Sequence, residues 1–297
     1  MKTLAAITRR NIKLFFKDKG MFLTSLITPV ILLVLYATFL GDVYRDSFTM
    51  NLPEGVTIPE KLLEGLVSGQ LISSILSVSC VTVAFCSNFL MVNDKALGAL
   101  NDFRVSPVKP SLLAIGYYIA TLSSTLIICF SAAAICLCYV AAVGFYMSLA
   151  DVLLLFLDII LLTLFGTALS SVVNFFLSTQ GQMSAVGTMV SSCYGFISGA
   201  YMPISSFGEG LQKVISFLPG TYGTALLRGH AMQGALAEME AEGVPEAVTK
   251  AMSDAVDINV YFFGNAVEVP VMYAILCGAT AALLVIYVLL NKFKKVK

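Results

Sequence analysis

The chain has 297 residues, of which 58% are hydrophobic and 12% are charged, and its mean hydropathy is +0.88. An ordinary soluble domain carries about 25% charged residues, so this composition excludes a soluble globular protein and indicates a membrane protein with several spans. The formal net charge is zero, and no nucleic-acid partner is expected.

Residues 1–20 are predicted to form an amphipathic helix that lies in the membrane interface. Plotted at about 100° per residue, apolar side chains fall on one side and basic side chains on the other. Such a helix directs its cations toward anionic lipid head groups. The alternative is a solvated basic N-terminus without this order. The apolar side is Leu4, Ile7, Ile12, Leu14, Phe15 and Phe16, and the basic side is Lys2, Arg9, Arg10, Lys13 and Lys17.

Six apolar runs follow, each long enough to cross a bilayer core of about 30 Å, which takes about 20 helical residues. The runs are continuous, whereas the strands of a membrane barrel would alternate in short segments. The sequence therefore predicts an all-α integral membrane protein with six transmembrane helices in a single domain. The runs lie at 21–40, 71–92, 111–140, 152–173, 183–203 and 269–290.

Basic residues are concentrated on one side of the predicted membrane. They cluster before the first run, in the 93–110 loop and after the last run, whereas the acidic residues gather in the other loops, above all in 237–257. The positive-inside rule therefore places both termini and the 93–110 loop in the cytoplasm of a multi-pass protein of the cell membrane.

The 93–110 loop is predicted to contain a short helix with one apolar face. Leu97, Leu100 and Phe103 are spaced at i, i+3 and i+6, and two prolines close the segment at Pro107 and Pro110. This face can pack on the protein's own inner surface or enter a groove of a soluble partner. The charged side chains around it are Asp94, Asp102 and Arg104.

Small and polar residues recur at helical spacing in the second and fifth runs. Such stripes let helices approach closely, which is one reading of the pattern. The other reading is the wall of a substrate pathway. Its predicted lining residues are Ser77, Phe85, Asn88, Thr188, Ser192 and Phe196.

Asp158 is the one ionisable residue inside an apolar run. Acids within a membrane are functional candidates by default. Asp158 is also predicted to lie near the outer N-terminal end of its helix, where the helix dipole favours an anion. A transport role and a structural role therefore both stay open.

Residues 204–266 are predicted to lie on the outer side, as re-entrant helices and an extracellular insertion. The first part is too apolar for a free loop but is interrupted by Pro219 and Arg228, which favours two short helices dipping into the outer leaflet. The acidic stretch 237–257 contains apolar residues at helical spacing, which predicts a small amphipathic helix on the outer surface.

The sequence lacks the motifs of catalysis and metal binding, so the chain is not expected to be an enzyme. It contains no P-loop, because no glycine is followed by lysine, and no G-x-S-x-G elbow. His230 is the only histidine, which excludes two-histidine metal centres, and it is predicted to be an outer-surface residue. All seven cysteines lie in apolar runs, where neither disulfides nor metal sites are expected.

Two sets of short motifs, together with the order of the six predicted spans, resemble the pattern of one protein family. The chain is similar to the ABC-2 type exporter permeases, and the resemblance covers essentially its whole length. The departures are Asn93 and Asn101, where acids are common, and the acidic 237–257 insertion. The cytoplasmic set is Asn93-Asp94-Lys95, Gly98-Ala99-Leu100, Asp102 and Ser106-Pro107-Val108, and the outer set is Ser198-Gly199, Met202-Pro203, Leu218-Pro219, Thr221-Tyr222 and Leu227-Arg228.

The resemblance implies that 93–105 is a coupling helix seated in a separate ATPase subunit. It implies two ATPase copies that bind ATP and Mg, no cofactor in this chain, and a second permease chain in a homodimer or related heterodimer. Alternating access across a bacterial plasma membrane would export an amphiphilic drug, lipid or antimicrobial peptide. The implied contacts are Asp94, Leu97, Gly98, Leu100, Asp102, Phe103 and Arg104, and the implied re-entrant segment holds Pro203, Pro219 and Arg228.

Two other classes of function remain in view. A secondary transporter or channel that is not powered by ATP would show ionisable pairs or inverted repeats, and the sequence shows neither. A membrane enzyme would need clustered acids or histidines at one depth. A nucleotide-hydrolysing partner would distinguish the exporter from both.

Overall fold

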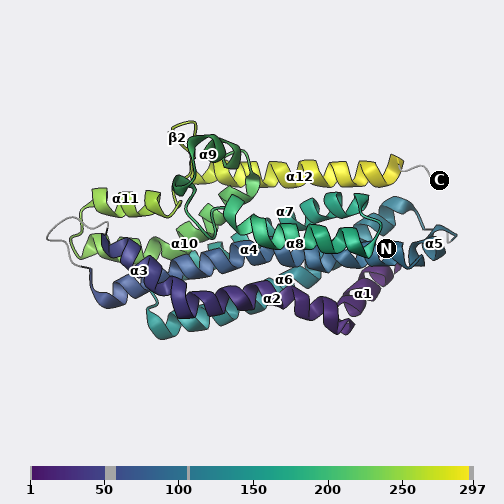
Figure 1. Cartoon of the computed structure of the whole chain (residues 1–297), viewed down its shortest axis with the longest axis horizontal. Helices are drawn as coiled ribbons and strands as arrows, with labels where there is room; N and C mark the ends of the chain where they lie inside the picture. Colours follow the sequence, from purple (N-terminus) through teal and green to yellow (C-terminus); the bar gives the residue numbers. More distant parts are fainter. Residues whose placement is uncertain (1, 51–57, 106–107, 294–297) are drawn as a thin grey trace.

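The protein is a bundle of long helices, and the computed structural model describes residues 2–50, 58–105 and 108–293 (Figure 1). The N-terminal helix and the helices of the bundle are α1 (Lys2–Lys17), α2 (Lys19–Leu35), the π-helix η1 (Tyr36–Leu40), α3 (Gly41–Met50), α4 (Glu60–Ala96), α6 (Pro110–Val143), α7 (Leu149–Phe176), α8 (Gln180–Ile197) and α12 (Val269–Phe293). The shorter elements and α10 are α5 (Ala99–Arg104), η2 (Ile204–Ser206), α9 (Glu209–Ile215), α10 (Pro219–Ala241), α11 (Glu246–Ala255), β1 (Tyr261–Phe262) and β2 (Asn265–Ala266), the last two paired antiparallel.

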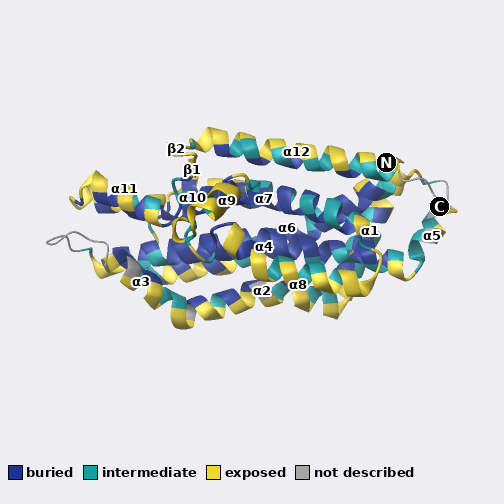
Figure 2. Ribbon diagram, turned by 45° about the horizontal axis from the view of Figure 1, so that its top comes forward, coloured by how far each residue is buried: buried dark blue, intermediate teal, exposed yellow. Residues whose placement is uncertain are grey.

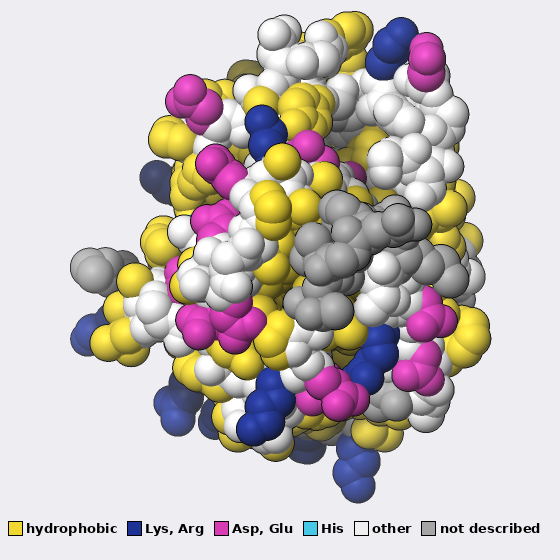
Figure 3. All heavy atoms as spheres, turned by 90° about the vertical axis from the view of Figure 1, so that its left-hand side faces the viewer, with side chains coloured by type: hydrophobic (Ala, Val, Ile, Leu, Met, Phe, Trp, Pro, Cys, Tyr) yellow, Lys and Arg dark blue, Asp and Glu magenta, His cyan; other side chains and the backbone are white. Residues whose placement is uncertain are grey.

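The long helices run roughly parallel, so the bundle has two ends. Helix α1, helix α5 and the last turn of α12 lie at one end, the terminal end, and α3 and α11 lie at the opposite, distal end (Figure 1). Acidic side chains are spread over the distal end (Figure 3), among them the exposed Asp46, Glu238, Glu242 and Glu246. This arrangement agrees with the predicted separation of basic and acidic loops.

Helix α4 forms the centre of the bundle. It packs against α2, α6, α7, α8 and α10, and 89% of its apolar stretch is buried, compared with 11% for α12. Figure 2 shows α4 buried along most of its length and α12 with a largely exposed face. With 37 residues, α4 is about 55 Å long, well beyond the bilayer core. The exposed apolar faces of α2, α6 and α12 suit contact with lipid tails.

Among the described residues, five helical segments are long and apolar enough to cross a membrane. They are 19–46, which joins α2, η1 and most of α3, together with α4, α6, α7 and α12. These match five of the predicted spans. The predicted span 183–203 corresponds to α8, which is not among them because glutamine, serine, threonine and glycine lower its hydropathy. That α8 crosses the membrane stays a prediction.

The segment between the first two predicted apolar runs, at 42–69, would be expected to form an outer loop, but most of its described residues are helical. Helix α3 covers 41–50, and α4 already begins at Glu60. Arg45 of α3 binds two acids of α4, with Nη2 at 2.9 Å from Glu64 Oε1 and Nη1 at 3.3 Å from Glu60 Oε1. A hydropathy search does not reveal α3 or the first turns of α4, because these polar segments project beyond the apolar core.

Two helices lie where a pair of short re-entrant helices is predicted, but only the first is short, and their entry into the membrane stays a prediction. Helix α9 has only seven residues, but α10 has 23 and continues through the acidic residues at 238 and 240. Pro219 stands in the first turn of α10, where it removes no helical hydrogen bond. The predicted amphipathic helix in 237–257 is confirmed as α11, which starts at Glu246.

The predicted N-terminal amphipathic helix is confirmed as α1. Its buried residues are Ile7, Asn11 and Phe15, and it packs mainly against α6. A Cβ added to Gly116 of α6 would lie 2.6 Å from Ile7 Cγ2, so this glycine admits the close approach. The apolar side of α1 therefore packs on the protein's own surface, and its place in the membrane interface stays a prediction.

Replacing Gly69 with alanine is expected to lower the free energy of unfolding by about 1–3 kcal/mol, because overpacking forces α4 and α10 apart. The added Cβ would lie 2.7 Å from the backbone oxygen of Ala231, which cannot rotate away. Thermal unfolding of the purified protein measures the loss. Gly181→Ala is the control, since no atom lies within 4 Å of its Cβ. Equal unfolding temperatures for both variants would contradict the close α4–α10 contact.

Candidate functional site

The link between α4 and α5 at the terminal end contains the predicted coupling residues. Gly98 has a φ of +78°, a conformation that favours glycine, and it lets the chain turn sharply from α4 into α5. Leu97 is 71% exposed and Asp102 is also exposed. Both side chains are therefore available to a partner. The side chain of Arg104 and residues Ser106 and Pro107 lie outside the described residues.

The predicted apolar face of α5 is divided between two directions. Leu100 and Phe103 are half-buried and cover a cavity of about 250 Å³, whose lining also includes Tyr117 and Tyr287. Leu97 instead faces away from the bundle. The spacing of i, i+3 and i+6 thus yields one exposed residue, Leu97, and two residues that attach α5 to its own chain.

Asp94 is buried at the end of α4 and is bound from inside the protein. Its Oδ2 lies 2.5 Å from Arg10 Nη1, its Oδ1 lies 3.2 Å from Arg10 Nη2, and the hydroxyl of Tyr117 donates to Oδ2 at 2.5 Å. Arg10 also lies over the ring of Phe103, 5.4 Å from its centroid. Asp94 therefore joins α1, α4 and α6 and is not exposed to a partner, contrary to its predicted role as a direct contact.

Lys95, the next residue, joins α4 to α7. Its Nζ donates to the carbonyl oxygens of Asn174 and Phe175, both at 2.8 Å, and of Leu177 at 3.1 Å. A cation at a helix C-terminus satisfies carbonyls that have no helical partner and complements the helix dipole. Two adjacent side chains thus connect the start of the coupling segment to α1, α6 and α7.

The six predicted pathway residues fall into two groups. Those of α4 are buried within this chain: Ser77 bonds Thr224 at 2.5 Å, Asn88 donates to Ser170 and Ser171 at 3.1 and 3.0 Å, and Phe85 is 2% exposed. Those of α8, which are Thr188, Ser192 and Phe196, are exposed along one face. Only the α8 group lies on a surface that a second chain or a substrate can reach.

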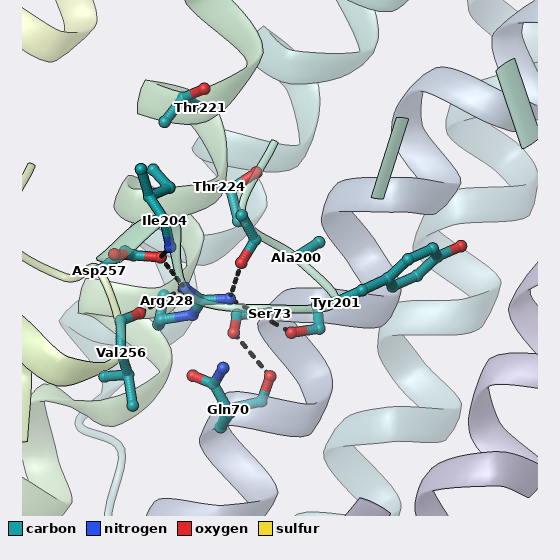
Figure 4. Close-up of polar contacts among 12 residues, drawn as sticks. Gln70, Ser73, Ala200, Tyr201, Ile204, Thr221, Thr224, Arg228, Val256 and Asp257 are labelled. Carbon is teal, nitrogen blue, oxygen red and sulfur yellow. Dashed lines mark hydrogen bonds and ion pairs between the residues drawn. The ribbon is translucent and has the colours of Figure 1, made fainter. Parts of the chain in front are cut away.

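Arg228 of α10 is fully buried and holds the turns around it together (Figure 4). Its guanidinium donates to the carbonyl oxygen of Val256 and, at 2.9 Å, to that of Gly199, and it lies 3.8 Å from Asp257 Oδ2. A longer contact of 3.4 Å reaches Ser74 Oγ on α4. Arg228 therefore joins Gly199, which precedes 203–219, to Val256, which follows it. The segment 203–219 contains the predicted re-entrant prolines.

Asp257 completes this cluster. Its Oδ2 accepts the backbone N–H of Ile204, the residue after Pro203, at 2.7 Å. Burial raises the pKa of the Asp257 carboxyl to about 6, against the opposing attraction of Arg228 and of the Ile204 N–H. At neutral pH this carboxyl is ionised, and its negative charge compensates the positive charge of the buried Arg228.

The polar contacts around Asp94 form one cluster and those around Arg228 form another. The two clusters lie at opposite ends of the apolar part of the bundle. Ser74 and Asp94 both belong to α4, and a rise of about 1.5 Å per residue separates them by about 30 Å. This is the thickness of a bilayer core. The two clusters therefore lie where charged groups can meet the two membrane surfaces.

Asp158 has two partners that the sequence analysis missed. Its Oδ2 lies 2.6 Å from His230 Nδ1, and its Oδ1 accepts the hydroxyl of Tyr273 at 2.6 Å. His230 is 8% exposed, so its prediction as an outer-surface residue is wrong. One signal in the sequence could have indicated this pair. His230 is the only histidine and Asp158 is the only acid within an apolar run, and ionisable residues inside a membrane tend to pair with one another.

Comparison with known protein families gives a single result. The family profile described as "ABC-2 type transporter" matches residues 2–231, which include α5, α8 and most of α10. No curated protein matches the chain.

Proposed function

The chain belongs to the ABC-2 type transporter family, and on this premise we propose that it is the membrane-spanning permease subunit of an ATP-driven exporter. ATP and Mg bind to a separate ATPase subunit, present in two copies, and this chain contributes no catalytic residue. Two permease chains, identical or related, complete the transporter. Alternating access moves an amphiphilic drug, lipid or antimicrobial peptide.

The observation that carries this proposal is the attachment of α5. The exposed residues Leu97, just before α5, and Asp102, within α5, are free to enter a groove of the ATPase. The adjacent Asp94 and Lys95 are bound to α1, α6 and α7. A displacement of α5 by the ATPase is therefore passed to three other helices through short charged contacts.

The second permease chain is proposed to face the exposed side of α8. Thr188 and Ser192 offer hydroxyls there and Phe196 offers an aromatic ring, which suits a substrate with polar and apolar parts. In this proposal the α4 residues Ser77, Phe85 and Asn88 do not contact substrate. They are buried within the chain and support the pathway wall formed by α8.

The terminal end is proposed to lie in the cytoplasm of a bacterial cell, so that α5 meets a cytoplasmic ATPase. The basic residues of α1 support this orientation, because they would face anionic head groups of the inner leaflet. The distal end, with its acidic surface, would then lie outside.

A photo-crosslinking amino acid at Leu97 is expected to capture a P-loop ATPase in cells, because this side chain projects from the bundle next to α5. Mass spectrometry of the adduct identifies the protein captured. The control is the same amino acid at Glu242, an exposed residue of the distal end. The proposal fails if purified protein transports substrate into liposomes with no nucleotide-hydrolysing subunit present, which would favour a secondary transporter or channel.

A further inference from the structure

A cavity of about 510 Å³ opens on the flank of the distal half, away from α5 and α8. It lies between α10, the β1–β2 hairpin and the first turn of α12. Its walls are mostly aliphatic, from residues such as Leu226, Leu236 and Met272. The cavity therefore offers an apolar compartment that the transport pathway proposed along α8 does not use.

His230 supplies a directed polar group to this cavity. Its Nδ1 is bound to Asp158, which Tyr273 orients from the other side. With a carboxylate as partner, Nδ1 carries a proton, and in the neutral imidazole Nε2 is then a hydrogen-bond acceptor. Nε2 bonds no described residue, although the side chain is only 10% exposed and lines the cavity. An imidazole nitrogen that lines a cavity and has no hydrogen-bond partner among the described residues is open to a ligand that donates.

The rim of the cavity adds negative charge. Glu240 and Glu268 line it, and the described lining residues include no lysine or arginine. Glu240 uses one oxygen to accept the hydroxyl of Thr249 at 2.6 Å, which leaves the other for a ligand. The amide nitrogen of Asn259 is bound to Asp254, so this side chain also presents its acceptor oxygen.

We propose that this cavity binds an amphiphile with an ammonium head group. The ammonium donates to His230 Nε2 and to the carboxylates of Glu240 and Glu268, and the apolar chain lies against the aliphatic wall. An ammonium has three donors and no acceptor, which matches a site made of acceptors. The site is separate from the exporter pathway, and its existence does not depend on the proposed function.

The depth of the site is compatible with ligands from the outer leaflet. Asp158 and Asn174 both belong to α7, and about 24 Å separates them along the helix. Asn174 accepts from Lys95 at the terminal end, so Asp158 lies near the opposite membrane surface. Both an outer-leaflet lipid with an amine head group and a soluble alkylamine can reach this depth.

Dodecylammonium is expected to bind the purified chain saturably in nanodiscs of phosphatidylcholine, as measured by calorimetry. Loss of one charged hydrogen bond weakens binding about tenfold or more, so Glu268→Gln and Glu240→Gln should each raise the Kd by that factor. Both side chains are exposed, so neither variant disturbs the core. Glu242→Gln, an exposed acid outside the cavity lining, is the matched control and should bind as the wild type does.

Nanodiscs that also contain phosphatidylethanolamine distinguish the two sources of ligand. If native mass spectrometry finds this lipid retained by the wild type but not by Glu268→Gln, and dodecylammonium displaces it, the resident ligand is a lipid. If only dodecylammonium binds, the site takes a soluble amine. Equal binding of neutral dodecanol, no saturable binding, or equal affinity in the two rim variants and the wild type would each overturn the proposal. The assay needs no ATPase, so its failure leaves the proposed function untouched.

Discussion

A methionine in place of Arg228 is expected to lower the free energy of unfolding by about 3–5 kcal/mol, the cost of breaking a buried ion pair from one side. The substitution leaves the Asp257 carboxylate without its counter-charge, and it leaves the carbonyl oxygens of Val256 and Gly199 without a donor. None of these groups gains access to water, because Arg228 is fully buried. Thermal or denaturant unfolding of the purified protein measures the loss.

Two further variants test the cause of this loss. Asp257→Asn in the Arg228→Met background should recover part of the stability, because the unpaired charge is then gone. Lys213→Met, a change of the same kind on the exposed surface of α9, should have little effect. If Arg228→Met and Lys213→Met unfold alike, Arg228 does not hold the 199–257 region together.

The second large effect is expected from Asp94→Asn, which should abolish the stimulation of ATPase activity by substrate. The asparagine keeps the size of the side chain but weakens its contacts with Arg10 and Tyr117, so the end of α4 that leads into α5 loses its charged attachment to α1 and α6. A change of about 1–3 kcal/mol in stability is expected as well, since hydrogen bonds to charged groups are worth that much. ATP hydrolysis and transport by the reconstituted complex measure the coupling.

A double-mutant cycle assigns this effect to the ion pair. Arg10→Met alone should impair coupling in the same way, and adding it to Asp94→Asn should cause little further loss, because both remove one interaction. Asp46→Asn, at an exposed acid of the distal end, serves as the control. Full substrate stimulation in the Asp94→Asn complex would show that α5 acts on the bundle by another route.

The spans could be predicted from sequence because the bilayer itself dictates their length and apolarity. The polar helices α3 and the first turns of α4 could not, since hydropathy carries no signal once a helix projects into water. Helix α10 was hidden for another reason. Arg228 and the glycines around it resemble interruptions, and only the fold provides the carbonyls and the carboxylate that allow this charge to be buried in a continuous helix.

The candidate site shows the same limit. Periodicity predicts a short helix from the spacing of Leu97, Leu100 and Phe103, and α5 covers Ala99–Arg104. It does not predict the turn at Gly98, which separates Leu97 from that helix. It cannot show that Asp94 faces inward, because its partner Arg10 is 84 residues away in the chain. Asp158 is likewise separated from His230 by 72 residues and from Tyr273 by 115. Pairings over such separations follow from helix packing, which no local pattern encodes.

The length of α4 has a mechanical consequence. A rod of about 55 Å that tilts by about 5° at its base moves its tip by about 5 Å. Because five helices pack against α4, they must tilt with it rather than slide past it. A small push at the terminal end would therefore reach the distal end as a larger displacement, with the whole chain turning as one body.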